Sequence, residues 1–253
     1  HHAGDIHGAC SRGRFDISPF VSAGQRVAVA VLISPPPHPG NPQEQTVQNG
    51  TGPNGGILAE DGPTFIASIG WDWMPAIRDR DVGIWKDVRL ESTGPVTIAD
   101  PLVTSTLPLP RIDSADLTVS ATVTNVTDQP ETGTLAGTIE STHFARPITL
   151  AAHQSLLVTF SPSDTPVLHM EHPRLWWPNT YGDPNLYTLH LEFTANHALS
   201  AAKDLSFGIR QITYDVPGTD NLTISCNGVP IICKGGDWGM DEAMKRSPRE
   251  RLD

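Results

Sequence analysis

The sequence predicts a mainly β protein with more than one domain. Its 253 residues are enough for one large domain or two of ordinary size. It contains 22 glycines and 23 prolines, a content typical of many short strands joined by turns. Alternation of apolar and polar residues recurs through the central part, whereas helical patterning is confined to the C-terminal end.

The N-terminal part predicts strands around a long loop. Arg26–Ile33 is rich in valine and follows a turn at 22–24, so we expect a buried strand there. Pro35-Pro36-Pro37 ends this strand, because proline has no N–H to donate to a ladder. Residues 38–64 lack periodicity, and loops of that length are commonly functional or mobile. Gly83–Leu90 predicts a further strand.

The central part predicts a small antiparallel sandwich of immunoglobulin type over about 95–214. Turn clusters at 127–130, 161–164 and 181–184 separate its predicted strands, a spacing typical of such sandwiches. The Cys…Trp…Cys pattern of antibody domains is absent. The alternating runs are Asp116–Asn125, Thr134–Glu140, Ser155–Phe160 and Leu186–Phe193.

The C-terminal part predicts the beginning of a β/α unit. Val229–Gly236 is a hydrophobic run that ends in glycines, and Asp241–Arg246 has the pattern of a helix start. A strand, a loop and a helix in this order begin a β/α unit. Glu242 fits an early-helix carboxylate near the positive end of the helix dipole.

Charge and composition exclude several functions. The net charge of −11 without a basic stripe argues against nucleic acid as a partner. No apolar run approaches the roughly 18 residues of a membrane span. The first residues, 1–5, lack the apolar region of a signal peptide, so we expect the chain to start inside a larger protein.

Cysteines and histidines predict neither a disulfide framework nor a metal centre. Cys226 and Cys233 could pair across a hairpin, but we expect free, buried thiols, and Cys10 has no nearby partner. The ten histidines lack ligand spacing, so no metal and no cofactor is expected. His169 and His172, three residues apart, lie in a stretch flanked by proline.

The stretch Trp71-Asp72-Trp73 is the strongest indication of a ligand. Trp is costly to expose and its N–H needs a partner, while an Asp between two Trp residues needs hydrogen-bond donors. A sugar meets both needs, because its C–H face stacks on indole and its hydroxyls donate to carboxylate. A Trp-rich core turn with a capping Asp is the alternative, since buried Trp is mostly core.

Several motifs follow one another along the chain. The first is Arg12–Ile17 with Val27-Ala28-Val29. The later ones are Gly83-Ile84-Trp85-Lys86-Asp87-Val88, Leu175-Trp176-Trp177-Pro178-Asn179, Phe207-Gly208-Ile209-Arg210, and Asn227-Gly228-Val229-Pro230 with Lys234-Gly235-Gly236-Asp237-Trp238. In this order they resemble family 2 glycoside hydrolases, most closely the β-mannosidase and exo-β-glucosaminidase branch, and the first motif is similar to late strands of the family's sugar-binding domain.

The resemblance implies three domains. Residues 1–94 would be the C-terminal part of a jelly-roll sugar-binding domain, and 95–214 an immunoglobulin-like β-sandwich. Residues 215–253 would be the truncated start of a (β/α)8 (TIM-barrel) catalytic domain.

The resemblance also implies retaining hydrolysis of β-mannosides or β-glucosaminides. Two glutamates from later barrel strands perform it, with carboxyls roughly 5–5.5 Å apart. The chain ends before those strands and contains no Asn-Glu pair of the family type. We therefore expect no catalytic residue in it, and no activity from the isolated chain.

By residue match, Asp72 would accept hydrogen bonds from the hydroxyls of the substrate sugar. Trp71 and Trp73 would line or pack the same loop. Trp238 would contact the sugar from the end of the first barrel strand, because such ends face the active site. Asp237 stands where Asn is more familiar, and would favour a cationic aminosugar or pair with an arginine.

Two further motif residues have structural interpretations. Trp176 and Trp177 are expected at an interdomain seam rather than on a sugar platform. Arg210 is expected in an ion pair that packs domains together.

Two other functions stay open: a non-catalytic pair of carbohydrate-binding modules, and a structural spacer. The expected partners are a β-mannoside or β-glucosaminide and the remainder of the barrel. The sugar, the linkage, the oligomeric state and the localisation are left open, and a secreted or periplasmic parent protein is compatible with the sequence.

Overall fold

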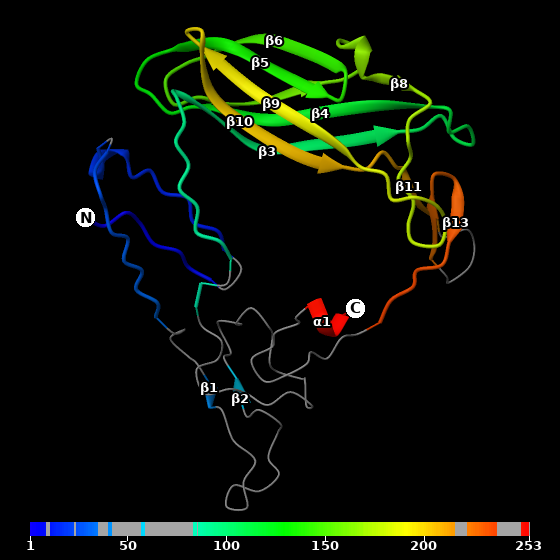
Figure 1. Cartoon of the computed structure of the whole chain (residues 1–253), viewed down its shortest axis with the longest axis horizontal. Helices are drawn as coiled ribbons and strands as arrows, with labels where there is room; N and C mark the ends of the chain where they lie inside the picture. Colours follow the sequence, from blue (N-terminus) through cyan, green and yellow to red (C-terminus); the bar gives the residue numbers. More distant parts are fainter. Residues whose placement is uncertain are drawn as a thin grey trace, which may run out of the picture. The chain divides into compact units, whose positions relative to one another are not determined.

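The chain forms two compact units in the computed structural model (Figure 1). The structure describes residues 1–8, 11–22, 24–34, 40–41, 57–58, 83–84, 86–215, 222–236 and 249–252. One unit is Leu90–Lys234, and the other combines His1–Arg89 with Gly235–Asp253. Strands are by far the commonest regular structure among the described residues, which confirms the mainly β prediction.

The unit Leu90–Lys234 is built around a sandwich of two antiparallel sheets. One sheet has the order β10 (Ala198–Phe207), β9 (Tyr187–Ala195), β5 (Glu131–Ile139) and β6 (Thr142–Leu150). The other has the order β3 (Val96–Thr106), β4 (Ser114–Asn125) and β7 (Ser155–Phe160), with β8 (His169–Glu171) also paired to β4. The turn η2 (Pro166–Leu168) precedes β8.

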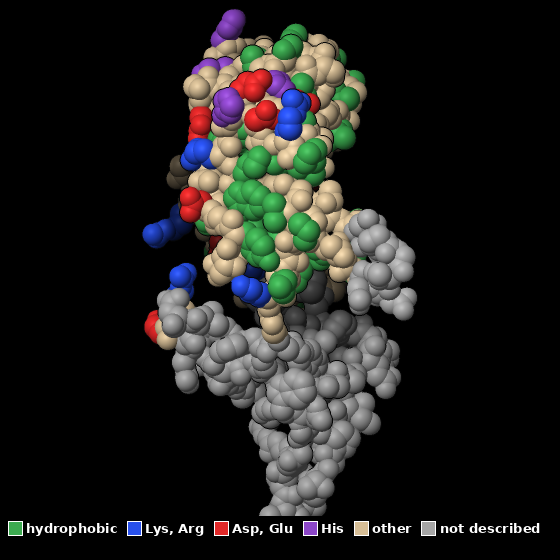
Figure 2. All heavy atoms as spheres, turned by 90° about the vertical axis from the view of Figure 1, so that its right-hand side faces the viewer, with side chains coloured by type: hydrophobic (Ala, Val, Ile, Leu, Met, Phe, Trp, Pro, Cys, Tyr) green, Lys and Arg blue, Asp and Glu red, His purple; other side chains and the backbone are tan. Residues whose placement is uncertain are grey.

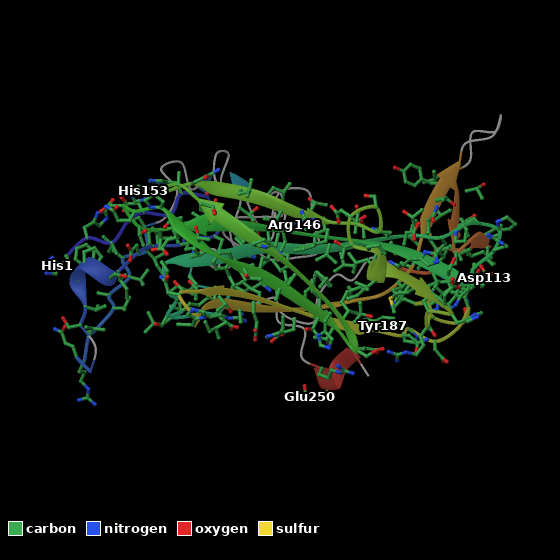
Figure 3. The ribbon with its side chains drawn as sticks, turned by 90° about the horizontal axis from the view of Figure 1, so that it is seen from above. His1, Asp113, Arg146, His153, Tyr187 and Glu250 are labelled. Atoms are coloured by element: carbon green, nitrogen blue, oxygen red, sulfur yellow. The ribbon has the colours of Figure 1, made fainter. Side chains whose placement is uncertain are left out.

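The core lies between these two sheets, and period-two alternation supplies it. Every second residue of β4 and of β9 is buried, from Leu117 to Val123 and from Leu189 to Phe193. Phe144 of β6 meets Phe160 of β7 edge-on, with ring centroids 4.9 Å apart, and so joins the two sheets. The Arg146 guanidinium, labelled in Figure 3, covers Phe160 from outside at 4.6 Å.

A bulge at Ser200 ties the start of β3 to β10. The β9–β10 register shifts between Leu199 and Ala201, which leaves Ser200 unpaired and turns its side chain inward. Its hydroxyl donates to the Val96 carbonyl at 2.7 Å and accepts from the Val96 N–H at 2.8 Å. This one side chain therefore links the first residue of β3 to β10, a strand of the other sheet.

Two tight hairpins use residues that tolerate positive φ. Asn196 and His197 join β9 to β10 with φ of 51° and 61°. Asn227 and Gly228 join β12 (Thr223–Cys226) to β13 (Val229–Ile231) with φ of 52° and 81°. Positive φ at both central positions defines the type I′ turn, whose twist matches that of the flanking strands.

A small antiparallel sheet follows the sandwich in the same unit. Its order is β11 (Ile212–Asp215), β12 (Thr223–Cys226) and β13 (Val229–Ile231). The predicted strand Val229–Gly236 therefore extends only to Ile231. The predicted helix start at 241–246 lies outside the described residues.

The other unit has little regular structure among its described residues. It contains η1 (Ser18–Phe20), β1 (Gly40–Asn41) paired with β2 (Ile57–Leu58), and α1 (Arg249–Leu252). The prediction of a buried strand at Arg26–Ile33 is wrong: these residues join no ladder, and Val29 and Leu32 are 74% and 92% exposed. Residues 83–84 and 86–90 of the second predicted strand form none either. A β-rich composition favours a strand only where a neighbouring strand supplies the ladder bonds.

Candidate functional site

The predicted sugar-contact residues lie outside the described residues. This applies to Trp71, Asp72 and Trp73 of the N-terminal loop, and to Asp237 and Trp238 beyond β13. Their roles stay predictions. The structure does show how the chain is held where it approaches Asp237.

The segment that leads to Asp237 is anchored by the loop around Tyr181. The Tyr181 hydroxyl accepts the Ile232 N–H at 2.9 Å. Two residues further on, the Lys234 ammonium donates to the Thr180 hydroxyl at 3.1 Å. Both anchoring residues lie in the loop that follows the Trp176-Trp177 motif. This loop therefore positions the segment that leads into the expected barrel.

Three of the motifs quoted above meet at one polar junction, which we define as Ser105, Trp176, Arg210, Gln211 and Asn227. The Asn227 amide donates to the Trp176 carbonyl at 3.1 Å and accepts the Gln211 N–H at 2.9 Å. The Ser105 hydroxyl donates to the Arg210 carbonyl at 2.7 Å and accepts the Arg210 N–H at 3.0 Å. The junction therefore joins β3, the Trp176 segment, the exit from β10 and the β12–β13 turn.

The Arg210 guanidinium stacks on the indole of Trp176, 4.2 Å from the ring centroid. Gly208 permits the close approach, because a Cβ there would lie 2.7 Å from the Trp176 Cβ. The ion pair expected for Arg210 is not formed within the described part of the chain, where an aromatic ring takes the place of a carboxylate. A guanidinium is suited to both roles because it is planar and weakly hydrated.

An open groove of about 480 Å³ runs beside this stack. Aromatic, apolar and hydroxyl side chains line it together with the Arg210 guanidinium. Its lining includes Val103, Ser105, Trp176, Leu186, Arg210 and Ile212.

Two histidines are each held by a pair of carboxylates on the sandwich surface. His190 of β9 bonds Glu192 at 2.8 Å and Asp204 of β10 at 2.6 Å, and these two bonds raise its pKa. His169 bonds Asp116 at 2.6 Å and Glu171 at 3.2 Å, and its pKa is raised for the same reason. Period-two spacing places His190 and Glu192 on one face, but Asp204 enters only through the pairing of β9 with β10.

The sequon Asn125-Val126-Thr127 has a structural role that the sequence does not reveal. Asn125 is 0% exposed. Its amide donates to the carbonyls of Gln129 at 2.7 Å and Ala151 at 3.0 Å. Its side-chain oxygen accepts the Thr127 N–H and hydroxyl at 2.9 and 2.8 Å. With every amide position used, this asparagine closes the turn between β4 and β5.

Cys226 and Cys233 are both free thiols, as expected. Cys226 is buried, and this burial raises its pKa. Cys233 is exposed, so the expectation that it is buried is wrong, because β13 ends two residues before it. Cys10 lies outside the described residues.

The described residues offer neither a metal centre nor a membrane-spanning helix. No group of three or more His, Cys, Asp or Glu side chains there could hold a metal ion. No helix in the same part of the chain is long and apolar enough to cross a membrane.

The sandwich with its junction defines a domain of two packed antiparallel sheets. Residues 96–210 match the model of glycosyl hydrolases family 2, a span that begins at β3 and ends in the junction. This match, together with a relative that is 33% identical over 95% of the chain, shows that the chain belongs to that family.

Characterised relatives extend the likeness to almost the whole chain. The exo-β-D-glucosaminidase of Streptomyces avermitilis is 33% identical over 242 residues, which cover 95% of this chain and 24% of that protein. The mannosylglycoprotein endo-β-mannosidase of Lilium longiflorum is 29% identical, over 96% of this chain and 26% of that protein. The chain thus spans about a quarter of the length of these relatives.

A solved structure with the same fold is the exo-chitosanase CsxA of Amycolatopsis orientalis. It superposes with a TM-score of 0.60 at 29% identity, over 67% of this chain and 19% of that one. The same enzyme has been solved in complex with PNP-β-D-glucosamine, again with a TM-score of 0.60.

Proposed function

We propose that this chain is the accessory part of a retaining exo-β-glycosidase that hydrolyses β-glucosaminides or β-mannosides. Residues 1–94 are the end of its jelly-roll sugar-binding domain, 95–214 its immunoglobulin-like sandwich, and 215–253 the entry to its barrel. The observation that carries the proposal is the match to the S. avermitilis exo-β-D-glucosaminidase, which includes 95% of this chain. The β-mannosidase relative keeps the second substrate class open.

In this proposal the chain supplies the non-reacting side of the substrate pocket. Asp72 accepts hydrogen bonds from sugar hydroxyls, because a charged acceptor binds them more strongly than a neutral one. Trp71 and Trp73 pack its loop, and Trp238 offers an indole face at the end of the first barrel strand. Asp237 adds negative charge beside it, which favours a protonated aminosugar over a neutral hexose.

The catalytic glutamates come from elsewhere in the polypeptide, so the test needs a barrel. In a chimera, this chain replaces the aligned quarter of the S. avermitilis enzyme. Turnover of 4-nitrophenyl β-D-glucosaminide and β-D-mannoside is then measured. We expect turnover by the chimera and none by the isolated chain.

Asp72→Ala in the chimera tests the proposed contact. We expect kcat/KM to fall about 10²-fold, the usual loss for one transition-state hydrogen bond. Asp81→Ala, a carboxylate nine residues away, is the matched control. A chimera that turns over neither substrate overturns the glycosidase proposal, whereas equal effects of the two substitutions remove only the role of Asp72.

A pair of carbohydrate-binding modules is the second candidate function, favoured by the Trp-rich loop. Calorimetry of the isolated chain with glucosamine, mannose and their oligomers separates the two. Tight binding without a barrel supports the modules, because the glycosidase pocket needs walls from both parts.

A further inference from the structure

Strand β8 (His169–Glu171) is held to the sandwich by a short ladder. Its three residues pair with residues 114–116 at the start of β4. Among the strands described, β4 is its one partner, and β8 lies outside the main order of the sheet. By comparison, the ladder that joins β9 to β10 has nine residue pairs. Few backbone bonds therefore hold β8 in place.

The chain is fixed on either side of β8. Leu168, the residue before it, is fully buried in the core. After it, the His172 N–H donates to the Asp113 carbonyl at 2.7 Å, and the Arg174 N–H donates to the Tyr187 hydroxyl at 2.7 Å. Figure 3 labels the two acceptor residues. β8 thus spans two anchors, Leu168 and Arg174, as a strap.

A histidine closes this strap onto β4, in an arrangement that we call the His169 clasp: His169, Asp116 and Glu171. The His169 Nδ1 atom lies 2.6 Å from the Asp116 Oδ1 atom of β4, and its Nε2 atom lies 3.2 Å from the Glu171 Oε1 atom. An ionised carboxylate only accepts hydrogen bonds, and a neutral imidazole has a single N–H to donate. Both bonds therefore exist together only while the ring carries two protons.

The two strands that carry the clasp supply only acidic charges to it. Asp116 is the one titratable residue of β4, and Glu171 is the only one besides His169 in β8. Thr106 of β3, which lies opposite Asp116, is uncharged. The turn η2 contains no titratable residue. Loss of the ring proton therefore leaves two carboxylates that share a single N–H.

The charged groups of β6, which packs against η2, have partners of their own. The His143 ring bonds the Thr138 hydroxyl at 3.1 Å. The Arg146 guanidinium pairs with Asp164 at 2.9 Å and covers Phe160. These groups are committed elsewhere, so the proton on His169 is the charge that holds the clasp together.

His169 exchanges its proton directly with solvent. Its side chain is 44% exposed. Figure 2 views the molecule from the side on which β8 lies in Figure 1, and histidine and acidic side chains gather at the upper end of that side. The bonds to Asp116 and Glu171 raise the pKa of His169. The clasp is therefore complete below the unfolded pKa of about 6.5 and is lost as the pH rises through the folded pKa.

His190 provides a comparison within the same unit. Its ring also bonds two carboxylates, those of Glu192 and Asp204. However, it joins the two strands of the nine-pair ladder, so loss of its proton weakens the sandwich without releasing a strand. The same chemistry can free a strand only where the ladder is as short as that of β8.

We propose that β8 is a pH-sensitive strap, which protonated His169 closes onto β4 and which opens when that proton is lost, while the rest of the sandwich stays folded. Leu168 and Arg174 limit the opening to the residues between them. Trp176 stays in place, because its N–H donates to the Ile209 carbonyl at 2.9 Å. The strap needs no barrel, so it operates in this chain by itself and independently of the proposed glycosidase function.

Hydrogen exchange of the whole chain, followed by NMR, measures the opening of β8. We expect the protection factors of the β8 amides to fall about 3- to 10-fold between pH 5 and pH 8.5, the range for two exposed ion pairs. His169→Gln should abolish this change. His190→Gln is the matched control, because it removes an equivalent pair of carboxylate bonds from another part of the sandwich. In that variant the β8 amides should keep the pH dependence of the wild type.

Asp116→Asn tests whether the proton and the strand are coupled. It keeps the shape of the side chain but removes the charge that does most to raise the pKa of His169. NMR of the His169 ring gives the midpoint of its titration, and the protection of β8 gives the midpoint of the opening. The two midpoints should coincide in the wild type, and both should move to lower pH in Asp116→Asn.

Three results would overturn the proposal. A pH dependence of β8 protection that survives His169→Gln would remove the role of the histidine. If the β8 amides exchanged no faster than the core amides of β4, the strand would open only when the whole sandwich unfolds. A ring titration without any change in β8 protection would uncouple the proton from the strand. Should His169→Gln fail to fold, the two midpoints in Asp116→Asn still decide the question.

Discussion

Asn125 allows a sharp test of how a buried polar side chain stabilises the sandwich. Asn125→Asp is nearly isosteric, but it replaces two N–H donors by an oxygen. The carbonyls of Gln129 and Ala151, now 2.7 and 3.0 Å from the amide nitrogen, would then face a carboxylate. Because the site is 0% exposed, water cannot replace the lost bonds without opening the turn.

The expected cost follows from the bonds that are lost. Two donated bonds contribute about 0.5–1.5 kcal/mol each, and two buried acceptors left without donors cost about 1–3 kcal/mol each. These effects overlap, and we expect the free energy of unfolding at pH 7 to fall by about 3–5 kcal/mol.

The cost should also depend on pH. Burial favours the neutral acid, so the folded-state pKa of the new carboxyl lies above the unfolded value of about 3.9. The penalty is therefore small below the unfolded pKa and grows as the pH rises toward the folded pKa. A protonated carboxyl also restores one of the two donors.

Urea denaturation from pH 4 to pH 8, followed by far-UV circular dichroism, measures this penalty. Asn196→Asp is the control, because Asn196 is an exposed turn residue at φ 51°, where Asp is also tolerated. A cost for Asn125→Asp no larger than for Asn196→Asp, or a cost that does not change with pH, would refute the reasoning.

Three further predictions concern the same unit. Ser200→Ala should lower the free energy of unfolding by about 1–3 kcal/mol, because it leaves the N–H and the carbonyl of Val96 without their hydrogen-bond partner. Ser206→Ala, at an exposed position of the same strand, should cost less than about 0.5 kcal/mol. The pKa of His190 is raised in the folded state, so its bonds to carboxylates stabilise the fold fully below the unfolded pKa of about 6.5. This stabilisation is lost as the pH rises through the folded pKa. The melting midpoints of wild type and His190→Gln should therefore converge at alkaline pH, and a difference that stays constant with pH would contradict this. A thiol reagent should modify Cys233 in the native protein but Cys226 only after unfolding, as peptide mapping by mass spectrometry can show; native labelling of Cys226 would argue against its burial.

The strands of the sandwich were largely predictable. Ser155–Phe160 was predicted with the boundaries observed, and Asp116–Asn125 begins two residues late. Alternation identifies such strands because one face is buried against a second sheet, so every other residue must be apolar. Ala198–Phe207 was not predicted, and its bulge explains why: Ser200 interrupts the alternation.

The prediction of a buried strand at Arg26–Ile33 failed because composition alone does not form a strand. Its valines satisfy the composition of a strand, but the ladder bonds of a strand come from another segment, which composition does not identify. For the site, the motifs were identifiable from the sequence, whereas the junction that joins Trp176, Arg210 and Asn227 was not. Each side-chain hydrogen bond of the junction joins a side chain to a main-chain group, and every residue carries such a group.

The sequence by itself determined the mainly β class, the central sandwich and the family, since alternation, turn residues and motif order are local or linear properties of the chain. Only the tertiary structure decided which residues became partners. It paired Asp204 with His190, buried Asn125 and stacked Arg210 on Trp176. The physical reason is that a period of two fixes which face a side chain occupies, while strand register and sheet stacking decide what lies opposite that face.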